Sequence, residues 1–139
     1  MMVLIRHYIE GRLLEWTNSL AFSALGISVF VWPKTATNPA FHLFASVMPS
    51  ELIGAVLLAC GFACIAALIA NGDSKAIGPR VRSYTALLRS ILLFQFGLST
   101  LQSSLAQGFP YTVVPFWFLM ALAEIWVAYR AVLDVRTLR

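Results

Sequence analysis

The sequence has 139 residues, of which 60% are hydrophobic and 12% are charged, and its mean hydropathy is +0.81. Soluble domains are about one half apolar and one quarter charged, so this composition disfavours a soluble domain, and the scarcity of charge excludes a disordered chain. The length allows one domain.

Four apolar stretches are each long enough to cross a membrane, which takes about 20 mostly apolar residues. In chain order they are residues 14–32, 51–70, 84–107 and 113–131. They lack the apolar and polar alternation of β-barrel strands. We therefore predict an all-α fold, with residues 1–139 forming one integral membrane bundle of four transmembrane helices. The first stretch is predicted to be a retained span, because three more spans follow it.

The connection between the first two spans is the longest, and Pro33, Pro39 and Pro49 interrupt it. Between these prolines, residues 41–48 are apolar and aromatic. This pattern predicts a short helix lying at the membrane surface.

The basic residues predict the orientation of the bundle. All ten except Lys34 fall on the side of the two chain ends and of the loop between the second and third spans. By the positive-inside rule that side is cytoplasmic, so an even number of spans places both termini in the cytoplasm. The net charge of +4 then needs no nucleic-acid partner and is typical of contact with anionic lipid headgroups.

Small residues recur every four positions in the second span, at Ala55, Ala59, Ala63 and Ala67. Such a smooth face lets another helix approach closely. Packing inside the bundle is the simpler interpretation, and a contact between copies of the chain is the alternative.

Arg89 and Glu124 are the charges that lie well inside predicted spans. An unpaired charge is costly in lipid, so we expect these two side chains to form an ion pair, within one chain or between subunits. The alternatives are a proton or ion relay and snorkelling to the headgroups.

Gln95 and Gln102 lie seven residues apart in the third span, which is the most polar of the four. They predict a polar face that either forms hydrogen bonds between helices or lines a wet path in an oligomer.

No catalytic constellation is found. Cys60 and Cys64 share a helix face but are poorly placed for a disulfide with each other, and no metal-ligand spacing surrounds them. His7 and His42 have no nucleophile or acid at a recognisable spacing. We therefore expect no enzyme activity, no cofactor and no metal.

Several short motifs follow one another in a familiar order. Residues 12–16 (RLLEW) open the first span, residues 71–72 (NG) close the second, and residues 79–82 (PRVR) lead to Gln95 in the third. Residues 123–131 (AEIWVAYRA) end the fourth span and precede a basic tail.

This arrangement resembles a loose group of small four-span membrane proteins encoded by tailed bacteriophages and prophages. Members of that group tend to carry a basic residue soon after the Asn-Gly turn, where this chain has Asp73. The resemblance implies a bacterial inner membrane protein, and size and span count suggest a holin-like role.

Three functions remain open from the sequence. The first is a phage-type membrane protein that self-associates and permeabilises the membrane in a holin-like way, with lipids and copies of itself as partners. The second is an accessory or structural subunit of a larger membrane complex. The third is a small oligomeric channel or transporter.

Overall fold

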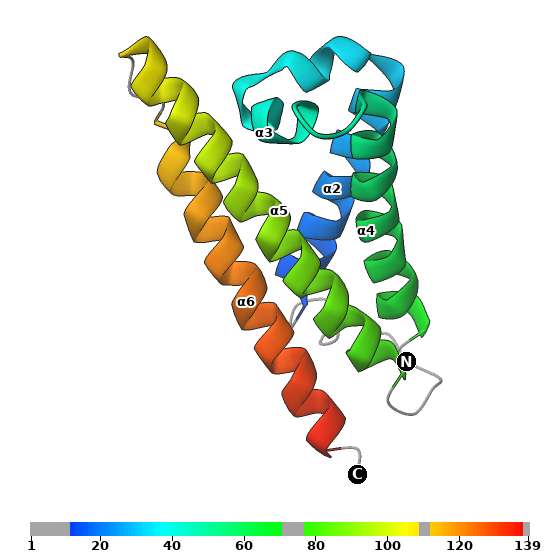
Figure 1. Cartoon of the computed structure of the whole chain (residues 1–139). Helices are drawn as coiled ribbons and strands as arrows, with labels where there is room; N and C mark the ends of the chain where they lie inside the picture. The colour runs from blue at the N-terminus through cyan, green and yellow to red at the C-terminus, as the bar shows by residue number, and fades with distance from the viewer. Residues whose placement is uncertain (1–11, 71–76, 109–111, 138–139) are drawn as a thin grey trace.

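The structure is a computed structural model that describes residues 12–70, 77–108 and 112–137. Its long helices are α2 (Leu13–Val31), α4 (Ser50–Ala70), α5 (Ile77–Gln107) and α6 (Val114–Thr137) (Figure 1). All four are long and apolar enough to cross a membrane. No strand occurs among these residues, so the expected all-helical chain with four membrane-length helices is confirmed. The predicted Asn71-Gly72 turn, Asp73, Arg6 and His7 lie outside the described residues.

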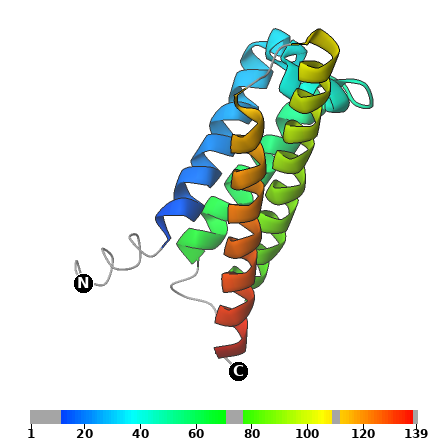
Figure 2. The same ribbon diagram turned by 90° about the vertical axis from the view of Figure 1, so that its left-hand side faces the viewer.

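The bundle has two ends, which we name by their contents. The connection between α2 and α4 lies at the loop end, and α2 begins and α6 ends at the terminal end (Figures 1 and 2). Of the described basic residues, Lys34 is the one placed at the loop end, in the 3-10 helix η1 (Pro33–Thr37).

α5 begins about two turns earlier than the sequence predicted, at Ile77 instead of residue 84. Pro79 does not prevent this, because a proline in the first turn of a helix removes an N–H group that has no partner there. The earlier start places Arg82 inside the helix. At its other end α5 stops before Gly108, whose φ of 67° is the left-handed conformation that commonly ends helices.

α2 and α4 pack closely because small residues line the contact between them. A Cβ atom added to Gly26 would lie 2.8 Å from the backbone nitrogen of Leu58, and one added to Gly61 would lie 2.7 Å from the carbonyl oxygen of Ser19. Any side chain at Gly26 or Gly61 would clash with the backbone of the facing helix, so both positions require glycine.

α5 and α6 form the second close pair and lie side by side in both views (Figures 1 and 2). The hydroxyl of Ser90 donates to the carbonyl oxygen of Ala121 at 2.9 Å, and the ring of Phe118 packs over Gly97. These contacts join the two helices in the middle of the bundle.

The connection at the loop end folds as η1, the 3-10 helix η2 (Pro39–Phe41) and the four-residue α3 (His42–Ala45). α3 is therefore shorter than the helix that the sequence predicted at residues 41–48. The segment fills the space between the two helix pairs (Figure 1), with Phe41 and Phe44 edge-on against Phe96 of α5. The backbone N–H of Leu43 donates to the hydroxyl of Ser99, which fixes the segment to α5.

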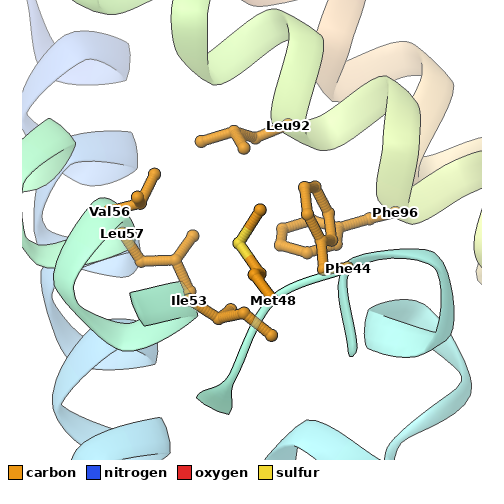
Figure 3. Close-up of a pocket in the computed structure, with 7 residues that line it drawn as sticks. All are labelled: Phe44, Met48, Ile53, Val56, Leu57, Leu92 and Phe96. Atoms are coloured by element: carbon orange, nitrogen blue, oxygen red, sulfur yellow. The ribbon is translucent and has the colours of Figure 1, made fainter. Parts of the chain in front are cut away.

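Below this segment, seven apolar side chains from α4, α5 and the connection converge on a small cavity (Figure 3). Its volume of about 30 Å³ is close to that of one water molecule, but its apolar lining offers no hydrogen-bond partner, so it stays dry.

Candidate functional site: a buried charge network

Near the terminal end, Arg82 of α5 connects three helices. Its Nε and Nη2 atoms donate to the two carboxylate oxygens of Glu15 on α2, at 2.7 and 2.6 Å. Its Nη1 atom donates to Asp134 on α6, at 3.1 Å. Arg12 also reaches Asp134, at 3.4 Å. Arg82 and Glu15 are almost completely buried, whereas the Asp134 side chain is 41% exposed, so this level of the network opens to the surroundings.

Two helical turns further in, Arg89 repeats this pattern. Its Nε and Nη2 atoms donate to Glu124 on α6, at 3.0 and 2.8 Å, and its Nη1 atom donates to the hydroxyl of Ser19 on α2, at 2.9 Å. Asn18 donates to the same carboxylate at 2.7 Å. Arg89 and Glu124 have no exposed surface. The thiol of Cys64 on α4 also interacts with Arg89, so all four long helices meet at this level.

The Arg89–Glu124 pair lies in the middle of the span. The membrane-length part of α6 is Val114–Asp134, and Glu124 is ten residues, about 15 Å, from either end of it. A hydrocarbon core is about 30 Å thick. In a membrane-spanning α6, Glu124 would lie near the centre of the hydrocarbon core, the position at which leaving either charge unpaired is most costly.

Helix periodicity places these side chains on matching faces. Glu15, Asn18 and Ser19 are spaced i, i+3 and i+4, which puts them on one face of α2, and Arg82 and Arg89 are seven residues apart on α5. The ion pairs described above join three arginines to three carboxylates. The charges of these six groups balance one another, which favours their burial.

The sequence predicted an ion pair between Arg89 and Glu124. In the structure these two side chains are paired within one chain. The sequence reasoning missed Glu15, Asn18, Arg82 and Asp134. A signal was present in the printed sequence: Arg82 precedes Arg89 by two helical turns, and Glu15 lies just inside the first predicted span.

The alanines of α4 do not behave as the simpler interpretation predicted. Ala55, Ala59 and Ala63 are exposed on the outside of the bundle, and Ala67 alone is buried. The prediction that these alanines pack inside the bundle is therefore wrong for three of the four residues. The contact with α2 uses the opposite side of the helix, where Gly54 and Gly61 allow the backbones to approach.

Gln95 and Gln102 also point away from the bundle core. Gln102 is exposed near the loop end of α5, and Gln95 is half-buried in a surface groove between α5 and α6. Within the described ranges neither amide has a hydrogen-bond partner, so the predicted hydrogen bonds between helices of one chain are not formed.

The remaining candidates show no reactive arrangement in the part of the chain that the structure describes. Cys60 and Cys64 are free and buried, and no three His, Cys, Asp or Glu residues gather as a metal site there. His42 is exposed on α3. Comparison with known proteins adds no candidate: no family model, no curated protein and no solved structure matches the chain.

Proposed function

We propose that this chain is a multi-pass membrane protein that acts by associating laterally with copies of itself, and that its intramembrane charges stabilise the bundle and take no part in chemistry. The observation that carries this proposal is the unpartnered amide of Gln95. Gln95 is six residues, about 9 Å, from Arg89 along α5. It therefore lies within the hydrocarbon layer, where an amide without a hydrogen-bond partner costs several kcal/mol.

A second copy of the chain supplies the missing partner most simply. An amide both donates and accepts hydrogen bonds, and in a two-fold symmetric interface each residue on the axis meets itself at the same depth. The groove around Gln95 has a volume of about 520 Å³ and is otherwise apolar apart from Ser90, whose hydroxyl is already bonded to Ala121. Its lining comes from two helices: Ile91 and Phe94 on α5, and Phe118, Leu122 and Ile125 on α6.

The exposed alanines provide a second smooth surface on another side of the bundle. Ala55, Ala59 and Ala63 lie on α4, which stands on the opposite side of the bundle from α6 (Figure 1). Two separate contact surfaces on one chain allow association to continue beyond a dimer into larger lateral assemblies.

The mass of the purified protein in lipid nanodiscs tests the proposal. We expect the natural chain to form an oligomer, Gln95→Leu to shift it to a smaller species, and Gln95→Asn to restore part of the association because the amide is kept. Gln102→Leu is the matched control, because it removes an exposed amide from the same helix outside the groove. A monomeric natural chain, or an oligomer unchanged by Gln95→Leu, would contradict self-association. Isolation as a one-to-one complex with an unrelated protein would identify an accessory subunit instead.

Cysteine crosslinking tests the alanine surface separately. In a chain with Cys60→Ala and Cys64→Ala, we expect Ala59→Cys to crosslink between copies in the membrane. Leu119→Cys, which is also exposed but lies on α6, is the control. Crosslinking that is no stronger at position 59 than at position 119 would rule out the α4 surface.

Holin-like permeabilisation of a bacterial inner membrane is our second candidate, and the charge network favours it. Separation of α2 from α5 and α6 would expose both levels of charge and provide a polar lining for a lesion. Controlled expression in bacteria should then abolish the membrane potential and stop growth abruptly, and Gln95→Leu should delay this. Continued growth with an intact potential would eliminate the holin-like role while leaving self-association in place.

For this function we infer that the terminal end faces the cytoplasm, because the basic residues are concentrated there. The α3 segment would then lie at the outer surface. Reporter fusions test the orientation: a cytoplasm-dependent reporter should be active at the C-terminus, and a periplasm-dependent one should be active when inserted after Val47.

A further inference from the structure

Two cavities at the loop end of the bundle meet at Trp117 of α6. The deeper cavity lies between α2, α5 and α6 and has a volume of about 260 Å³. Its lining is apolar except for Asn18 at its inner end: Ala21, Phe22, Leu25, Leu93, Phe96, Phe116, Trp117 and Met120. The second, of about 240 Å³, lies at the rim and includes the polar residues Asn38 and Thr100.

Together the two cavities run from the rim of the bundle to its middle. Val113 lines the rim cavity, and Asn18, which lines the inner one, is bonded to Glu124, eleven residues further along α6. Eleven residues of helix measure about 16 Å. One leaflet of a hydrocarbon core, half of about 30 Å, has nearly the same depth.

We propose that the two cavities form a slot for one phospholipid acyl chain, with the ester and headgroup region of that lipid at the rim beside Asn38 and Thr100. The lipid belongs to the leaflet at the loop end. The combined volume is within the range of small-molecule sites, about 300–1,000 Å³.

The chemistry of the lining favours an acyl chain over the other possible occupants. Water is disfavoured, because seven of the nine side chains that line the deep cavity are aliphatic or phenyl groups without a polar atom that could hydrogen-bond to it, and one N–H of the Asn18 amide already donates to Glu124. A second copy of the chain is a less suitable occupant, because the apolar lining of the deep cavity offers few groups for a specific hydrogen bond between copies. The groove at Gln95 differs in this respect, because it offers the Gln95 amide. An acyl chain needs no polar partner except near its ester group.

The rim provides groups suited to that ester region. The Thr100 hydroxyl donates to the Phe96 carbonyl and keeps its capacity to accept. The indole N–H of Trp117 is buried and has no acceptor among the described residues. Trp117 is three residues, about 5 Å, inside the start of α6, so its indole lies close to the membrane–water interface at which tryptophans are enriched.

Native mass spectrometry of the full chain released from mild detergent tests the slot, and its result does not depend on self-association. We expect one retained phospholipid per chain. Ala21→Phe on α2 and Met120→Trp on α6 enlarge two side chains that line the slot, and each should reduce the retained lipid severalfold. Ala24→Phe and Leu119→Trp, which place the same side chains on neighbouring exposed positions, should retain it.

The proposal is overturned if the natural chain retains no lipid, or if lipid persists in both slot-filling variants. A second readout does not require those variants. In a chain with Trp16→Phe, Trp32→Phe and Trp126→Phe, a brominated-chain phospholipid titrated into detergent should quench Trp117 fluorescence and saturate at one lipid per chain. Quenching that rises linearly without saturation would also overturn it.

Discussion

Arg82 binds both carboxylate oxygens of Glu15 with its Nε and Nη2 atoms, and Arg89 binds Glu124 with the same two atoms one level deeper. The partners alternate between helices. Arg82 directs its paired donors to α2 and its Nη1 atom to α6, whereas Arg89 directs its paired donors to α6 and its Nη1 atom to α2. Each of the two arginines therefore binds both α2 and α6, and the helix that receives the paired donors differs between them. For this reason α2 and α6 cannot slide past α5 without breaking hydrogen bonds at both levels.

Removing one member of the deeper pair should destabilise the bundle more than removing both. Arg89→Met leaves the Glu124 carboxylate buried without its cation, and the loss of one partner of a buried pair costs about 3–5 kcal/mol. The double variant Arg89→Met with Glu124→Leu removes both charges and should recover part of that loss. Thermal unfolding in detergent micelles measures the difference. If the double variant is as unstable as the sum of the single variants, the two residues do not act as a pair.

The shape of the arginine group should matter as well as its charge. Arg89→Lys keeps the positive charge but cannot present two parallel donors to Glu124 while a third reaches Ser19. We expect a lower unfolding temperature than in the natural chain. Arg80→Lys, at an exposed position near the start of α5, is the control and should change little. Equal effects of the two substitutions would show that charge alone suffices at position 89.

Loss of a carboxylate should lower the unfolding temperature by different amounts at the two levels of the network. Glu124→Gln leaves Arg89 at mid-membrane without a carboxylate, whereas Glu15→Gln leaves Arg82 with Asp134 near the exposed end of the network. The loss of unfolding temperature should therefore be larger for Glu124→Gln. The reverse order would mean that the level near the terminal end holds the bundle together.

The sequence predicted the deeper pair because both residues interrupt otherwise apolar stretches, and lipid tolerates a charge only when it is paired. It did not predict the outer level, because the predicted third span begins at residue 84 and leaves Arg82 in the connection before it. Proline occurs both in the first turn of helices and in loops, so Pro79 alone does not show where the helix begins. The contact that Arg82 makes distinguishes the two cases. That contact, with Glu15, joins residues that are 67 positions apart.

Phe96 should be the most sensitive aromatic side chain. Its ring contacts Phe41, Phe44 and Trp117 at centroid distances of 5.1, 5.3 and 5.5 Å, so it joins the α3 segment to α6. Phe96→Ala should cost about 3–5 kcal/mol and loosen that segment. Unfolding temperature and limited proteolysis between residues 33 and 48 measure the two effects. Phe62→Ala is the control, because Phe62 on α4 is about half exposed and lies outside this aromatic cluster. Unchanged proteolysis in Phe96→Ala would show that the segment is held independently of this ring.

Small residues gave the least reliable sequence signal. Four alanines at a spacing of four looked like the packing face of α4, yet the close contact with α2 uses Gly54 and Gly61, seven residues apart on another side of the helix. Both patterns are compatible with helix packing, and the sequence of α4 alone does not specify which side meets α2. The choice depends on the matching surface of α2, where Ser19, Ser23 and Gly26 lie opposite the glycines.

This packing predicts a graded response to added methyl groups. Gly61→Ala would place its Cβ atom 2.7 Å from the Ser19 carbonyl oxygen and 2.8 Å from the Ser23 nitrogen, and the backbone can relieve this only by moving the helices apart. Overpacking of this kind costs about 1–3 kcal/mol. Moving α2 would also disturb the hydroxyl of Ser19 that accepts from Arg89. Gly54→Ala meets the ring of Phe30 at 3.0 Å, which can rotate away, so its effect on unfolding temperature should be smaller. If Gly54→Ala proves the more damaging variant, the closest approach of α2 and α4 is nearer the loop end than Gly61.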